Sequence, residues 1–149
     1  MITIQADSIA KPALDERKVT RWIKSVAADY GFSVGNINYI FCSDERELEV
    51  NRQFLGHDYY TDIITFDYST PSVLNGDIFI SLDTVRSNAE ELLGGQGRGG
   101  KGPYEMELHR VIIHGVLHLC GINDKGPGER EVMEACENKA LDLLLMHNS

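Results

Sequence analysis

The apolar positions along this chain follow two periods, one typical of strands and the other of helices. Short runs rich in β-branched and aromatic residues predict strands at residues 2–6, 37–42, 63–68 and 76–81. Apolar residues at three- and four-residue steps predict helices at residues 15–30, 44–55, 82–93, 104–121 and 127–145. We therefore expect one α+β domain over residues 1–149, in which a small, mostly four-stranded mixed sheet packs with about five helices.

The last two predicted helices differ in what they carry. The final helix has a wide apolar face that begins at Val132 and ends at Leu145, and we interpret this face as core. The helix before it contains no proline between Tyr104 and Gly121, and it holds His114 and His118. Candidate chemistry is thus concentrated on this late helix and on the loop that follows it.

His114 and His118 are four residues apart, which is about one turn of a helix, so both imidazoles project from the same face. Two such imidazoles can bind one divalent ion. Gly121 readily adopts the left-handed conformation that ends a helix, and the resulting turn brings Asp124 back towards the ion. Three protein ligands leave a fourth tetrahedral position open to water, which is typical of a catalytic zinc site.

Two other interpretations of the histidine pair stay open. Histidines on an apolar helix face can be core residues with satisfied hydrogen bonds, and a closed structural zinc site would need a fourth Cys or His. Cys120 is the only thiol nearby, and two positions after His118 it points about 160° away from the histidine face. We favour the open metal site over both.

The charge of the chain restricts its partners. Asp and Glu number 23 against 14 Lys and Arg, which gives a formal net charge of −9. A protein that coats nucleic acid non-specifically relies on many cations, so any RNA contact here must be local. The most basic segment, Arg98 to Lys101, lies within a glycine-rich stretch that has five glycines at residues 94–100. A solvated loop is the favoured interpretation.

Compartment and membrane association can also be addressed from the sequence. No apolar run approaches the roughly 20 residues that span a bilayer, so no membrane association is expected. The N-terminus lacks the basic start and apolar centre of a secretory signal. The three cysteines are widely spaced and odd in number, which argues against a disulfide framework. A cytoplasmic location is expected.

Residues 114–124, His-Gly-Val-Leu-His-Leu-Cys-Gly-Ile-Asn-Asp, are similar to the signature of the YbeY family of bacterial ribosomal-RNA maturation endoribonucleases, His-Gly-x-Leu-His-Leu-x-Gly-Tyr-Asp-His. Upstream, residues 50–51 and 61–66 resemble the family's Leu-Asn and Thr-Asp-Val-Leu-Ser-Phe. Residues 76–81 resemble its Gly-Asp-Ile-x-Ile-Ser. The three motifs occur in the family's order and spacing.

The resemblance implies a zinc-dependent, single-strand-selective endoribonuclease that acts in ribosomal-RNA processing and small-subunit quality control. It implies ribosomal RNA and the small ribosomal subunit as partners, and no organic cofactor. His114 and His118 match two of the family's three histidine ligands, whereas the third falls on Asp124. A carboxylate can bind zinc, but it makes Mn²⁺ or Fe²⁺ more plausible and leaves the bound water less acidic.

A second departure concerns the phosphate of the substrate. The family commonly has an arginine where this chain has Leu55, and Arg52 and His57 are the nearest substitutes. Asp62, with Thr61 at the entrance to the third strand, is a candidate for lining the cleft by hydrogen bonding. Arg52, His57 and Asp62 are therefore the catalytic candidates, and the sequence identifies no general base.

Two alternative functions follow from these departures. One is a non-catalytic ribosome-assembly factor in which a structural metal braces the last two helices. The other is a metal hydrolase of another substrate class, of which a peptidase is disfavoured. Zincin peptidases place the glutamate that activates water directly after the first histidine, and here that position is Gly115.

Overall fold

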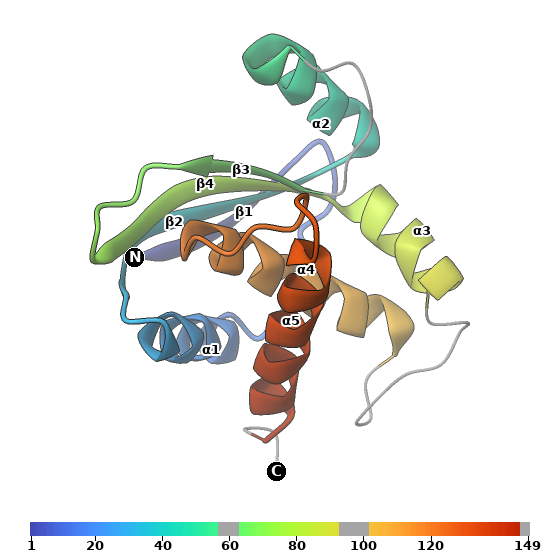
Figure 1. Cartoon of the computed structure of the whole chain (residues 1–149). Coiled ribbons are helices and arrows are strands. Elements are labelled where there is room, and N and C mark those ends of the chain that lie inside the picture. Colours follow the sequence, from blue (N-terminus) through green and yellow to red (C-terminus); the bar gives the residue numbers. More distant parts are fainter. Residues whose placement is uncertain (57–62, 93–101, 147–149) are drawn as a thin grey trace.

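The computed structural model describes residues 1–56, 63–92 and 102–146 (Figure 1). In these ranges the strands are β1 (Ile2–Asp7), β2 (Ser33–Cys42), β3 (Ile63–Asp67) and β4 (Val73–Ser81). They form one sheet in the order β1-β2-β4-β3. The first three strands in that order are parallel, and β3 pairs antiparallel with β4 at the edge. The predicted four-stranded mixed sheet is confirmed.

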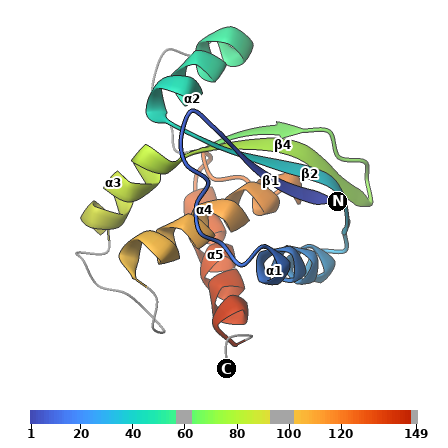
Figure 2. The ribbon, with the colours of Figure 1, turned by 180° about the vertical axis from the view of Figure 1, so that it is seen from behind.

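The described residues also form five α-helices, as predicted. These are α1 (Glu16–Asp29), α2 (Asp44–Val50), α3 (Leu82–Leu92), α4 (Pro103–Leu119) and α5 (Glu129–Met146). A π-helical turn, η1 (Asn51–Leu55), continues α2. Helices α1 and α4 lie along one side of the sheet with α5 crossing α4, whereas α2 stands on the opposite side (Figures 1 and 2). No helix in the described ranges has the length and apolarity needed to cross a bilayer.

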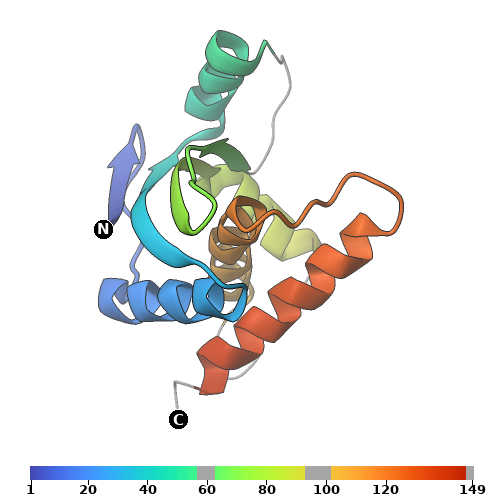
Figure 3. The same cartoon turned by 60° about the vertical axis from the view of Figure 1, so that its left-hand side comes forward.

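Helix α4 is the centre of the core, since it contacts the sheet on one side and α5 on another (Figure 3). The Tyr39 hydroxyl of β2 donates a hydrogen bond of 2.9 Å to the Ile112 carbonyl of α4. The Trp22 indole of α1 donates one of 2.7 Å to the Ala140 carbonyl of α5. Both aromatic side chains are fully buried, so these two bonds fix the helices against the sheet and against each other.

Two glycines permit the close approach of β3, β4 and α4. A Cβ atom at Gly115 would lie 2.9 Å from Ile78 Cδ1 and 3.1 Å from Ile63 Cδ1. A Cβ atom at Gly76 would lie 2.6 Å from the carbonyl oxygen of Phe66. Glycine is thus required at Gly76, because the neighbouring atom there belongs to the backbone of the paired strand.

The Gly76→Ala variant should consequently be destabilised. Its methyl group has to push β3 away from β4, and overpacking of this kind typically costs about 1–3 kcal/mol. Urea unfolding would measure the change in the free energy of unfolding. An unchanged midpoint would mean that β3 moves aside without cost.

Some boundaries differ from the predicted ones. Strand β4 begins at Val73 rather than Gly76, because Ser69 and Thr70 hydrogen-bond to the backbone of Asn75 and Val73 and close a tight hairpin. The predicted core residue Val132 is instead 56% exposed, and the buried positions of α5 begin one residue later, at Met133. The glycine-rich segment at residues 94–100 lies outside the described residues.

Candidate metal centre

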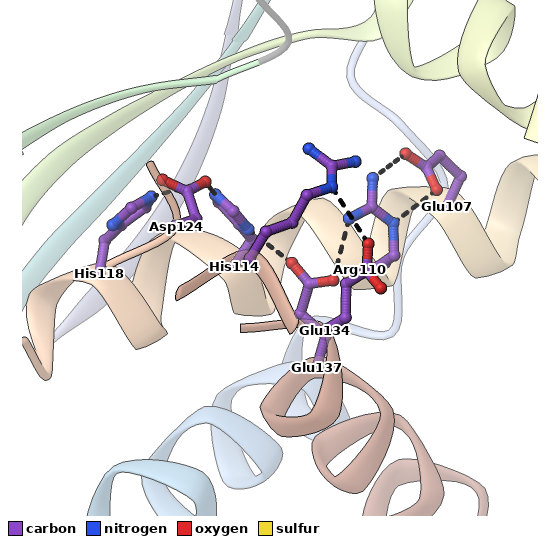
Figure 4. Close-up of polar contacts among 8 residues, drawn as sticks. Glu107, Arg110, His114, His118, Asp124, Glu134 and Glu137 are labelled. Atoms are coloured by element: carbon purple, nitrogen blue, oxygen red, sulfur yellow. Dashed lines mark hydrogen bonds and ion pairs between the residues drawn. The ribbon is translucent and has the colours of Figure 1, made fainter. Parts of the chain in front are cut away.

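His114, His118 and Asp124 converge at one point beside α4 (Figure 4). Their ligand atoms all lie within 4.8 Å of one another. Asp124 Oδ2 is 3.3 Å from His114 Nε2 and 3.6 Å from His118 Nε2. The two histidines project from successive turns of α4, as their spacing predicts, with ring centroids 4.5 Å apart.

The end of α4 explains how Asp124 reaches the histidines. Gly121 has a φ of +95°, the left-handed conformation that glycine adopts at little cost. The Gly121 amide donates to the His118 carbonyl at 2.9 Å, and the Ile122 amide donates to the Leu117 carbonyl at 3.0 Å. These bonds satisfy the last carbonyls of the helix and reverse the chain, so the turn predicted at Gly121 is confirmed.

Burial and charge prepare His118 for metal binding. Burial, followed by repulsion from His114, lowers the pKa of His118 below its ordinary value. The imidazole is therefore neutral near pH 7, which is the form that binds a metal. The side chains of His114, His118 and Asp124 are 14%, 27% and 23% exposed, so solvent reaches the cluster. This exposure argues against the interpretation of His114 and His118 as core residues buried among aliphatic side chains.

The donor set fits a divalent ion. Two imidazole nitrogens and one carboxylate oxygen suit Zn²⁺, Mn²⁺ or Fe²⁺, and three ligands leave a position for solvent or substrate. Burial raises the pKa of the Cys120 thiol to about 11, and the charge of Asp67 adds to this effect. A protonated thiol is a poor ligand, and within the described ranges no fourth Cys or His joins the group. The arrangement is that of an open site.

Three further charged residues lie behind His114, and the sequence analysis missed them (Figure 4). His114 Nδ1 lies 2.5 Å from Glu137 Oε2 on α5. Arg110 Nη1 donates to Glu137 Oε1 at 3.0 Å, and Arg110 Nε donates to Glu107 Oε1 at 2.7 Å. Burial acts to raise the pKa of Glu137, but the bond from His114 and the charge of Arg110 outweigh it and hold that pKa below its ordinary value.

The catalytic candidates fall in a different part of the chain. Arg52 is exposed on η1, on the α2 side of the sheet. His57, Asp62 and Thr61 lie outside the described residues, as does the side chain of Leu55. Catalytic roles for Arg52, His57 and Asp62 stay predictions.

Comparison with known proteins identifies the family of this chain. The family model described as Endoribonuclease YbeY matches residues 2–144. This chain belongs to the Endoribonuclease YbeY family. The predicted resemblance is confirmed, and the match extends over both the sheet and the three convergent residues.

Relatives that carry the family name are similar to this chain in sequence, and one solved structure is similar to it in fold. The chain is 62% identical over 144 residues to Endoribonuclease YbeY of Phocaeicola vulgatus, covering 97% of this chain and 99% of the relative. It is 50% identical over 143 residues to that of Porphyromonas gingivalis strain W83, covering 96% and 89%. The solution structure of TM1509 from Thermotoga maritima aligns with a TM-score of 0.65 at 26% identity, covering 99% of this chain and 91% of that one.

Proposed function

We propose that this chain is a metal-dependent, single-strand-selective endoribonuclease that matures ribosomal RNA in the cytoplasm and acts with the small ribosomal subunit. One observation carries the proposal: His114, His118 and Asp124 bring their ligand atoms within 4.8 Å of one another in a chain whose relatives are named endoribonucleases. Zn²⁺ is the expected ion, with Mn²⁺ or Fe²⁺ as alternatives because of the carboxylate ligand.

Each of the three residues would have a defined part in the reaction. His118 and His114 would supply neutral nitrogens, and Asp124 would supply the negative charge that balances part of the ion's charge. When bound, the ion would polarise a phosphoryl oxygen or acidify water for attack on phosphorus. The partial exposure of all three side chains leaves room for the RNA phosphate to approach.

The position after the first histidine argues against a zincin peptidase. In such peptidases a glutamate at that position points at the ion's water. Here Gly115 is buried, and any side chain added to it would meet Ile78 and Ile63 of the sheet. A carboxylate could not be accommodated there, so the peptidase alternative stays disfavoured.

Removal of both imidazoles tests the proposal. The His114→Ala/His118→Ala double variant should lose about one equivalent of metal and should no longer cut single-stranded RNA. Metal analysis and a cleavage assay with matched single-stranded and duplex RNA would measure both effects. His109→Gln is a suitable control, because it removes an imidazole from the same helix outside the cluster.

Three results would contradict the proposal. Cleavage that persists in the double variant would show that the activity does not depend on this site. Equal metal content in the wild type and the double variant would show that the three residues bind no ion. In cells lacking the gene, full rescue by the double variant would favour the non-catalytic assembly factor instead.

A further inference from the structure

Glu137 is a buried carboxylate that is not among the three proposed metal ligands, yet it contacts one of them. Its side chain is 3% exposed and lies between α5 and α4. Oε2 is 2.5 Å from His114 Nδ1, and Oε1 is 3.0 Å from Arg110 Nη1. Both carboxylate oxygens are thus engaged, each by a different partner, and the two partners come from successive turns of α4.

The hydrogen bond to Glu137 determines which nitrogen of His114 carries the proton. An ionised carboxylate can only accept hydrogen bonds, so Nδ1 has to be the donor. In a neutral imidazole the other nitrogen, Nε2, is then unprotonated and has its lone pair available. This is the nitrogen that faces Asp124 at 3.3 Å. The tautomer that Glu137 imposes on His114 is therefore the one whose Nε2 can bind a metal.

Arg110 prevents Glu137 from turning. Arg110 is held in turn by Glu107, which is 2% exposed and accepts two hydrogen bonds, from Nε and Nη2 of the guanidinium. Glu107, Arg110 and His114 lie at steps of three and four residues on one face of α4. A continuous series of hydrogen bonds therefore leads from Glu107 through Arg110 and Glu137 to His114 at the metal centre (Figure 4).

We propose that Glu137 is a positioning residue that holds His114 in its metal-binding tautomer, and that Arg110 and Glu107 fix the carboxylate of Glu137 for this purpose. The inference rests on the proposed metal site and adds a residue from α5 to it. Partners of this kind behind a histidine ligand typically contribute about 10–100-fold to metal affinity.

The Glu137→Gln variant separates positioning from packing. Arg110 offers only donors, so the amide oxygen of Gln has to face Arg110, and its NH₂ group then faces His114 Nδ1. This reverses the hydrogen bond, places the proton of His114 on Nε2 and blocks the metal-binding nitrogen. Glu137→Ala removes the same carboxylate but imposes no tautomer. Compared with alanine, glutamine preserves the volume of the Glu137 side chain better, but it favours the tautomer of His114 that cannot bind metal.

Titration with Zn²⁺ against a competing chelator would measure the effect. We expect Glu137→Gln to bind Zn²⁺ about 10–100-fold more weakly than the wild type, and more weakly than Glu137→Ala. Glu134→Gln is the matched control, since it makes the same substitution on α5 at a carboxylate that is 57% exposed and pairs with Arg130 instead of His114, and its Zn²⁺ affinity should remain close to that of the wild type. A purely structural role for Glu137 would instead make Glu137→Ala bind Zn²⁺ more weakly than Glu137→Gln. That result, or equal Zn²⁺ affinities of Glu137→Gln and Glu134→Gln, would overturn the proposal.

A second measurement reports the tautomer of His114 directly. Nitrogen-15 chemical shifts of His114 in the metal-free wild type should show Nδ1 protonated and Nε2 unprotonated, and Glu137→Gln should show the reverse. Protonation of Nε2 in the wild type would overturn the proposal even if every variant failed to fold. If the wild type bound no Zn²⁺ while His114 kept its Nδ1 proton, the proposed function would fail and the tautomer assignment would stand.

Discussion

Replacement of Arg110 by alanine is expected to cost about 3–5 kcal/mol of unfolding free energy, because it leaves buried carboxylates without their cation. Glu107 and Glu137 are 2% and 3% exposed at the side chain, and Arg110 hydrogen-bonds to both. When Arg110 is removed, the two carboxylates stay buried without a compensating charge, and their desolvation cost is no longer offset. Urea unfolding of the metal-free protein would measure the loss without any contribution from bound metal.

An exposed ion pair on the neighbouring helix provides the control for Arg110. Arg130 and Glu134 lie four residues apart on α5 at 3.2 Å, with side chains 78% and 57% exposed. Arg130→Ala should change stability by no more than about 0.5 kcal/mol. If Arg110→Ala were as mild as Arg130→Ala, the buried network would not hold α5 against α4.

The second large effect is expected at Asp124. Loss of a residue that hydrogen-bonds to a ligand typically lowers metal affinity about 10–100-fold. Asp124→Ala removes a proposed ligand itself, so its Zn²⁺ affinity should fall by more than this. Asp124→His restores the three-histidine set of the family signature, and its affinity should hold or rise. The side chain is 23% exposed, so neither change should disturb the core. Competition titration with a chelator would measure the Zn²⁺ affinity of the wild type, Asp124→Ala and Asp124→His.

Asn123→Ala serves as the control for the loop, since Asn123 is exposed beside Asp124 and is not among the three convergent residues. It should bind Zn²⁺ as the wild type does. A loss of binding in Asp124→His, with the fold intact, would show that the carboxylate geometry and not the ligand count sets the site. Wild-type affinity in Asp124→Ala would remove Asp124 from the site altogether.

The order of helices and strands could be predicted because each follows a single strong pattern. The apolar period of α1 and the glycine after it, for example, determine that helix without reference to the rest of the fold. Boundaries that depend on side chains of another element could not be predicted. The start of β4 depends on the hydrogen bond that the Ser69 hydroxyl donates to the Asn75 carbonyl and on the one that the Thr70 hydroxyl accepts from the Val73 amide. In the sequence these two residues indicate only a turn.

The three proposed ligands could be predicted because they are brought together by local geometry. The residues behind His114 could not, because they depend on how two helices pack. His114, His118 and Asp124 converge through local geometry, namely one helix turn and a glycine that ends the helix. Glu137 lies 23 residues from His114 on another helix, and its surroundings in the sequence resemble an ordinary polar face. Only the crossing of α5 over α4 buries it beside Arg110, so a polar residue became part of the interior.

Binding of one metal ion by His114, His118 and Asp124 underlies both the proposed function and the role of Glu137. Anomalous scattering at the zinc absorption edge, from crystals of the protein prepared with Zn²⁺, tests it most directly. We expect one peak at about 2.0–2.2 Å from His114 Nε2, His118 Nε2 and an Asp124 carboxylate oxygen. A map with no peak among these three atoms, or with the zinc held by other side chains, would contradict it.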